Sequence, residues 1–128
     1  MTNPTEVITQ ALGTEPYKEG DYFAFNSGGV ETAVGEFLFG LIKIVRPERV
    51  CETGTHKGIS TAYMGLALKE NQKGNLETIE FDQQWWKEAE ELWRKLEIEK
   101  YVYLHKMKVE EYLKLQAKEN TFWYKIKF

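Results

Sequence analysis

Short β-prone runs alternate with helical stretches along most of the chain, and this alternation constrains the fold more than any other feature. Apolar residues recur at three- and four-residue steps over about 31–45, 59–70, 83–97 and 109–118. The β-prone runs that follow these stretches are "RVCET", "LETIEF", "YVYLH" and "TFWYKIKF". Strands that alternate with helices of about 10–15 residues predict right-handed crossovers and a mostly parallel sheet. The fold class is therefore α/β.

The pattern changes near residue 30, which we interpret as the boundary between two parts of the chain. Residues 1–29 are rich in glycine, proline and asparagine, and they predict an irregular N-terminal arm with one short helix at about 5–12. Residues 30–128 predict a single α/β domain. Its first helix shows one apolar face, formed by Val30, Val34, Phe37, Leu38, Leu41 and Val45.

Composition restricts the partners and the compartment. The 128 residues carry 17 basic and 20 acidic side chains, for a net charge of -3. This balance gives no electrostatic case for binding nucleic acid or an anionic membrane, so a small-molecule partner is the expectation. The single cysteine, Cys51, fits a reducing compartment. With no signal peptide and no continuous apolar span of about 18 residues, the sequence predicts a cytoplasmic protein.

The stretch "CETGTHKGIST" joins the first predicted strand to the following helix through two glycines. Gly54 can adopt a backbone conformation that a side chain would forbid. Gly58 lets the turn approach a ligand closely and lets the helix pack on the sheet. The helix that starts there presents free N–H groups, with the hydroxyls of Ser60 and Thr61 at the same end. Such a helix start favours an anionic group.

Two carboxylates flank this turn and indicate what the ligand carries. Glu80 lies at the tip of the second predicted strand, where an acid can accept both hydroxyls of a ribose. Glu52 lies two residues before the first glycine of a G-x-x-x-G spacing, which differs from the G-x-G-x-x-G of dinucleotide sites. An acid there would repel a pyrophosphate and attract an amino group. S-adenosylmethionine carries an amino group, a carboxylate and a ribose.

At these residues the sequence resembles the class I S-adenosylmethionine-dependent methyltransferases, and most of all the small O-methyltransferases of the catechol and caffeoyl-CoA kind. The matching segments, within about residues 26–115, are "ETGTHKGIST", "GNLETIEFDQQWWKEAEELWRKLEI" and "YVYLHKMKVEEYL". The resemblance implies a Rossmann-like sheet, here truncated to about four strands in the order 3-2-1-4. It also implies S-adenosylmethionine as the cofactor and a small hydroxylated molecule as the methyl acceptor.

The resemblance also assigns residues to the cofactor. Ser60 would hold the carboxylate, Glu80 would take the ribose hydroxyls, and Phe81 would lie against adenine. Trp85 or Trp86 could border adenine as well, although helical spacing favours core positions for both. The full set of implied cofactor residues is Glu52, Thr53, Gly54, Thr55, His56, Gly58, Ser60, Glu80, Phe81 and Glu110.

His56 is the only catalytic candidate, and it is a weak one. It would face the sulfonium side of the cofactor and could act as a general base. A loop residue beside the cofactor is the simpler interpretation, because methyl transfer depends chiefly on alignment of the reacting atoms. His105 and Cys51 are interpreted as structural.

The C-terminal run departs from the family pattern. Its expected strand, 121–128, ends without the aspartate that binds a metal in the catechol-like branch, so no metal ligand is predicted. Apolar and lysine side chains alternate in this run, as in an edge strand, and we expect a homodimer that pairs through it. Two alternatives stay open: a cofactor-binding module without catalysis, and a nicotinamide-dependent dehydrogenase. The methyl acceptor, independent activity, and whether residue 128 is the natural end also stay open.

Overall fold

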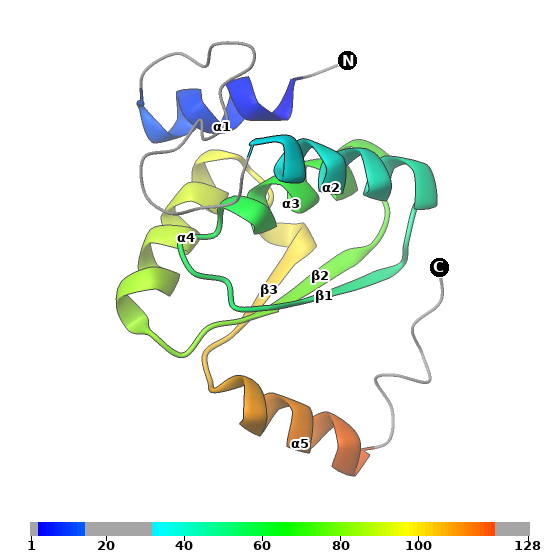
Figure 1. Ribbon diagram of the computed structural model, residues 1–128, viewed down its shortest axis with the longest axis vertical. Coiled ribbons are helices and arrows are strands. Elements are labelled where there is room, and N and C mark those ends of the chain that lie inside the picture. Colours follow the sequence, from blue (N-terminus) through cyan, green and yellow to red (C-terminus); the bar gives the residue numbers. More distant parts are fainter. Residues whose placement is uncertain (1–2, 15–31, 120–128) are drawn as a thin grey trace.

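A three-stranded parallel sheet forms the centre of the molecule, which is a computed structural model that describes residues 3–14 and 32–119 (Figure 1). The strands are β1 (Arg49–Thr53), β2 (Asn75–Ile79) and β3 (Val102–His105), in the order β1-β2-β3. Both pairings are parallel. The structure thus confirms the α/β fold with a parallel sheet. The fourth predicted strand, 121–128, lies outside the described residues, so its place in the order 3-2-1-4 remains a prediction.

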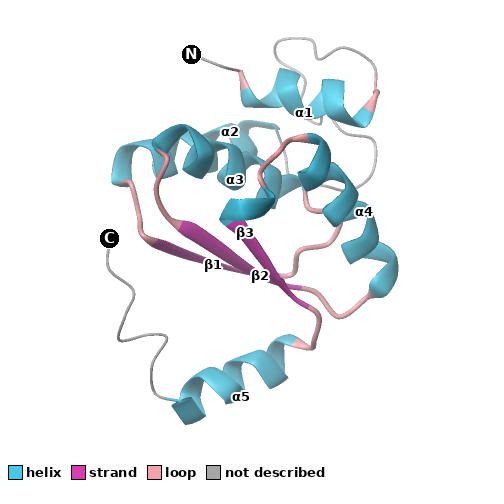
Figure 2. Cartoon of the chain, turned by 180° about the vertical axis from the view of Figure 1, so that it is seen from behind, coloured by secondary structure: helices cyan, strands magenta, loops and turns pink. Residues whose placement is uncertain are grey.

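Helices lie on both sides of this sheet (Figures 1 and 2). One side carries α2 (Thr32–Val45), α3 (Ile59–Asn71) and α4 (Gln83–Lys95). Beyond the other side lies α5 (Val109–Glu119), and a short 3-10 helix, η1 (Glu99–Tyr101), leads into β3. Each of the four helices predicted after residue 30 is present. Among the described residues, no helix is both long and apolar enough to cross a membrane.

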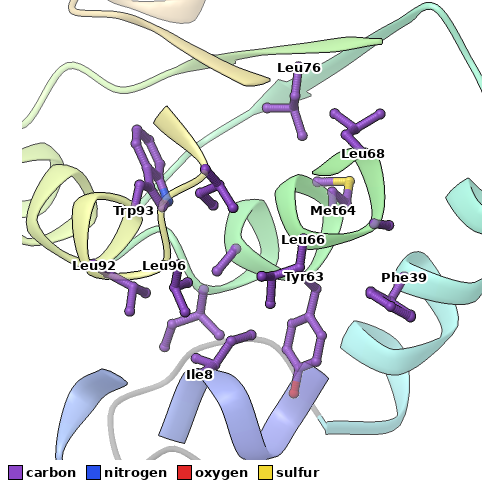
Figure 3. Close-up of a cluster of buried hydrophobic side chains, with 14 of the residues drawn as sticks. Ile8, Phe39, Tyr63, Met64, Leu66, Leu68, Leu76, Leu92, Trp93 and Leu96 are labelled. Carbon is purple, nitrogen blue, oxygen red and sulfur yellow. The ribbon is translucent and has the colours of Figure 1, made fainter. Parts of the chain in front are cut away.

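Helix α3 lies at the middle of the hydrophobic core (Figure 3). Its residues are buried around most of the helix, because α2 packs on one flank and the sheet on another. Tyr63 is fully buried, and its ring fills the space beside Gly35 of α2. A Cβ atom at Gly35 would lie 2.3 Å from this ring, so only glycine allows the two helices to approach this closely.

The short helix predicted near the N-terminus is present as α1 (Pro4–Leu12). The Asn3 side chain caps it by accepting from the backbone N–H groups of Thr5 and Glu6. Ile8 is fully buried in the core, and the Thr5 hydroxyl lies 2.7 Å from the Tyr63 hydroxyl. This segment therefore completes the layer of helices over α3 (Figure 1).

Helix α2 matches its predicted range, but the apolar residues that revealed it are mostly not the ones that pack. The buried residues of α2 are Thr32, Gly35, Phe39 and Ile42. Phe37 and Leu41, which marked the apolar face in the sequence, are 65% and 42% exposed. The helix is apolar on two sides, so the periodicity located it without showing which side faces the core.

Candidate functional site

The turn between β1 and α3 holds three residues in left-handed backbone conformations. Gly54, His56 and Gly58 have φ angles of 80°, 52° and 79°. The backbone N–H groups of Gly54 and Thr55 both donate to the carbonyl of Ile79, at 3.0 and 3.1 Å. These bonds tie the turn to the carboxyl end of β2, the edge where open parallel sheets bind ligands.

Gly58 is required at the start of α3 for space as well as for conformation. A Cβ atom there would lie 2.6 Å from the Cβ of Ala89 and 2.8 Å from Nε1 of Trp93. The Trp93 indole N–H donates to the Gly58 carbonyl at 3.1 Å. No side chain caps the helix at Gly58, so the first-turn N–H groups of α3 can meet an anionic group.

Glu52, near the end of β1, has its carboxylate surrounded by hydroxyl donors. Ser60 donates to Oε2 at 2.5 Å, Thr78 donates to Oε1 at 2.8 Å, and Thr61 also donates to Oε1. Burial is the largest influence and raises the pKa of Glu52, while the three hydroxyl hydrogen bonds act to lower it. The carboxylate is therefore held in a fixed position at a cost in solvation.

The hydroxyls behind Glu52 form a directed chain. Thr78 has a single hydroxyl hydrogen and donates it to Glu52. The Thr55 hydroxyl, 2.6 Å from that of Thr78, must then be the donor in their mutual hydrogen bond. Strand register brings this about, because Glu52 and Thr78 are direct partners in the β1–β2 pairing. The sequence analysis did not assign a role to Thr78, and the available signal was a threonine in the middle of the predicted strand "LETIEF".

Glu80 follows β2 and reaches back to the same turn. Its Oε1 accepts from the His56 backbone N–H at 2.7 Å, and its Oε2 accepts from the Asp82 N–H at 3.1 Å. Its own N–H donates to the His105 carbonyl at 3.1 Å, which fixes the backbone against the end of β3. A carboxylate offers about four lone-pair positions, so about two remain for further donors.

Aromatic side chains border this edge. The rings of His56 and Trp85 lie with centroids 4.3 Å apart, and the Lys57 ammonium lies 5.3 Å from the Trp85 ring centroid. Trp85 and Trp86 are only half-buried, so the core positions favoured for them are wrong, whereas Trp93 is 3% exposed as expected. Periodicity could not separate Trp86 from Trp93, because they lie seven residues apart and therefore on the same side of α4.

The predicted site residues thus divide into two groups. Glu52, His56, Ser60 and Glu80 lie on one network of strand ends and turn, described above. Thr53 and Phe81 are exposed at the ends of β1 and β2, and Glu110 is exposed in the first turn of α5, after β3. The Ser60 hydroxyl is already donated to Glu52, which competes with its predicted role toward a carboxylate.

Polar residues also gather on the sheet face toward α5, away from this network. Glu77 accepts from Arg49 at 3.0 Å and lies 3.0 Å from Nε2 of His105. The His105 ring packs against Tyr112, whose pKa is raised mainly by burial. Cys51 on β1 is half-buried. These contacts give His105 a structural role, as the sequence indicated.

Solved structures with a similar fold include several methyltransferases. An O-methyltransferase from Bacillus cereus in complex with SAH is 20% identical, with a TM-score of 0.63 over 95% of this chain and 50% of that chain. SAH-bound PaMTH1 of Podospora anserina is 16% identical, with a TM-score of 0.66 over 90% and 46%. TomG of Streptomyces achromogenes in complex with SAM is 22% identical, with a TM-score of 0.58 over 82% and 43%. This chain spans about half the length of these structures.

Sequence comparison identifies the family. A search of curated proteins gives no match. A family model described as a methyltransferase domain matches residues 51–123, which include the last three residues of β1, the glycine turn and both site carboxylates. Because this match covers more than half of the chain, the protein belongs to the methyltransferase-domain family, and the resemblance to the S-adenosylmethionine-dependent methyltransferases is confirmed.

Proposed function

We propose that this chain binds S-adenosylmethionine across the carboxyl ends of β1 and β2. The single observation that carries the proposal is the 2.7 Å hydrogen bond from the His56 N–H to the Glu80 carboxylate. It joins the turn that would hold the methionine part to the acid that would hold the ribose. The two ends of the site are therefore one connected unit.

The chemistry of the residues fits the ligand. The cofactor's α-amino group would approach Glu52, whose position is fixed by hydroxyl donors. Its carboxylate would meet the first-turn N–H groups of α3, and its ribose hydroxyls would donate to the remaining lone pairs of Glu80. Phe81, 64% exposed beside Glu80, would lie against adenine, with Thr53 and Glu110 at the border of the site.

Methyl transfer to a small hydroxylated acceptor is the activity that we propose for the whole protein. Bound S-adenosylmethionine supplies a methyl group on a positively charged sulfur. This chain's contribution is to hold both ends of the cofactor, so that the methyl group points in one direction. The family match and the O-methyltransferases among the similar folds support this reaction class.

We also propose that the protein is cytoplasmic and homodimeric. The single free cysteine suits a reducing compartment. The segment 121–128, through which we expect the dimer to pair, lies outside the described residues, so this pairing remains a proposal from the sequence.

Calorimetry with S-adenosylmethionine, S-adenosylhomocysteine and NAD tests the binding proposal. We expect the first two to bind and NAD to bind far more weakly. Glu80→Ala should weaken S-adenosylmethionine binding at least tenfold, because hydrogen bonds to a charged acceptor contribute about 1.5–3 kcal/mol each. The affinity of Glu80→Gln, which keeps one acceptor oxygen, should lie between that of Glu80→Ala and that of the parent.

Glu88→Ala is the matched control, because Glu88 is an exposed acid on α4. It should bind as the parent does. Equal affinity of Glu80→Ala and the parent would contradict the ribose assignment, and preferential binding of NAD would favour the dehydrogenase alternative. Binding of S-adenosylmethionine without turnover on a panel of catechols would favour the non-catalytic module.

A further inference from the structure

We propose that the outward side of α2 is the interface through which two copies of this chain associate. This surface, the α2 seam, consists of Val34, Phe37, Leu41, Ile44 and Val45. The inference deepens the proposed homodimer and rests on it. It assigns the contact to described residues, in place of the segment 121–128.

The α2 seam is the main concentration of exposed apolar side chains among the described residues. Five of the ten large apolar side chains that are exposed there belong to α2. Their exposed fractions run from 39% for Val45 to 82% for Ile44. An apolar side of a helix normally faces other protein, yet only one of the two apolar sides of α2 faces the core, and α2 lies in the outer layer of the molecule (Figures 1 and 2).

Charged side chains lie off the α2 seam and are already engaged. The Glu36 carboxylate accepts from the Thr5 hydroxyl at 2.8 Å, and the Lys43 ammonium lies 3.5 Å from the Glu70 carboxylate. Both residues lie between the α2 seam and the buried side of the helix. Two such surfaces can therefore meet without bringing like charges together, and without removing a charge from its partner.

The spacing within the α2 seam favours another helix of the same kind as the occupant. Val34, Phe37, Leu41 and Ile44 follow at steps of three, four and three residues, the spacing by which paired helices interlock. A contact between identical surfaces related by a two-fold axis requires such self-complementarity. The same helix from a second copy supplies the matching steps.

The size of the α2 seam is consistent with a stable contact. From the exposed fractions, its five side chains present roughly 500 Å² per copy, and two copies would bury about 1,000 Å², the lower limit for a specific interface. The exposed Ala33 and the half-buried Leu38 flank it and would add to this area. The other exposed apolar residues, Leu12, Phe81, Tyr103, Leu113 and Leu115, are spread over other elements.

Analytical ultracentrifugation of the full chain and of single-charge variants tests this interface. We expect the parent to be dimeric at micromolar concentration. Phe37→Glu and Ile44→Glu should raise the dimer dissociation constant at least a hundredfold. Leu115→Glu, the same kind of change on the exposed part of α5, should leave it unchanged. Circular dichroism and urea unfolding will show whether each variant keeps its fold, and Ile44, 82% exposed, is the safer site in this respect.

A second measurement tests the geometry. Leu41 lies near the middle of the α2 seam. When two copies of a helix pair around a two-fold axis, residues at the middle of the contact lie beside their own copies, whether the helices run parallel or antiparallel. Leu41→Cys in a Cys51→Ser background should therefore form a disulfide-linked dimer when diamide is supplied as the oxidant. Leu113→Cys in the same background should not.

Three results would overturn the proposal. If the parent were monomeric, both the homodimer and the interface would be wrong. This result is expected if residues 15–31 or a different protein cover the α2 seam. A dimer that both α2 variants leave intact, but that Ile126→Glu dissociates, would keep the homodimer and place its contact in 121–128. If Leu113→Cys cross-linked as readily as Leu41→Cys, the proposed contact through the α2 seam would be wrong.

Discussion

The β1–α3 turn and the α2 seam each break the rule that polar groups lie outside and apolar groups inside, and they do so in opposite ways. At the turn, the largely buried carboxylate of Glu52 receives hydrogen bonds from three hydroxyls of its own chain. On the α2 seam, apolar side chains such as Ile44 face outward. The hydroxyls of the same chain satisfy the Glu52 carboxylate, whereas covering the α2 seam requires a second molecule.

The sharpest test of this comparison uses two phenylalanines on the same helix. Phe39 is 5% exposed and Phe37 is 65% exposed. Phe39→Ala should lower the free energy of unfolding by about 3–5 kcal/mol, because it leaves a cavity in the core. Phe37→Ala should change it by no more than about 0.5 kcal/mol in the monomer. Urea unfolding at a protein concentration below the dimer dissociation constant measures the stability of each variant as a monomer. Similar losses of stability in the two variants would mean that the α2 seam is covered within the monomer.

The two glycines of the turn provide the next test. Gly58→Ala should cost about 2–4 kcal/mol of stability, because a left-handed alanine is strained and its Cβ would press on Ala89 and Trp93. Gly54→Ala meets open space and should cost only about 1–2 kcal/mol for its φ of 80°. Thermal and urea unfolding give both values. If Gly54→Ala were the more harmful to stability, the packing argument at Gly58 would be wrong.

The sequence predicted the fold well where local pattern and tertiary packing coincide. Each described strand and α-helix after residue 30 matches a predicted range, because glycine, proline and strand-prone runs separate the elements clearly, whereas the short 3-10 helix η1 was not predicted. The packing direction of α2 could not be predicted, since both of its sides are apolar. Burial also differs between Trp86 and Trp93, although they lie seven residues apart on the same side of α4, because the buried residues of this helix are confined to its later turns, at Ala89, Leu92 and Trp93.

The candidate site was predictable at its acids and less so at its hydroxyls. Glu52 and Glu80 stand at the ends of strands, so their neighbourhood follows from a parallel sheet alone. The role of Thr78 depends on the register that sets it opposite Glu52, which no local pattern encodes. Ser60 was assigned to the ligand, but its hydrogen bond to Glu52 appears only once the helix is placed against β1.

Glu52→Gln tests whether the buried acid serves binding more than stability. We expect S-adenosylmethionine affinity to fall at least tenfold, because the amino group loses a charged acceptor. Burial raises the pKa of Glu52 in the folded protein. Its contribution to stability is therefore fully present below the ordinary glutamate pKa of about 4.3, and it is lost as pH rises through the folded-state pKa.

The variant should thus be at least as stable as the parent at neutral pH, and its advantage should grow as pH rises through that range. Urea unfolding at several pH values, with calorimetry at neutral pH, measures both effects. A variant that lost stability at neutral pH while keeping full affinity would reverse the roles that we assign to Glu52.

The smallest effect is expected at His56, and it separates the backbone of this residue from its ring. His56 holds a φ of 52°, which asparagine also tolerates, so His56→Asn should keep the N–H that Glu80 accepts. The variant loses the ring contact with Trp85, a loss of about 0.5–1.5 kcal/mol at most. Calorimetry should therefore show S-adenosylmethionine affinity reduced by less than about tenfold, well below the loss expected for Glu80→Ala. A loss as large as that of Glu80→Ala would show that the imidazole contacts the cofactor directly, and the turn would then act through its side chains more than through its backbone.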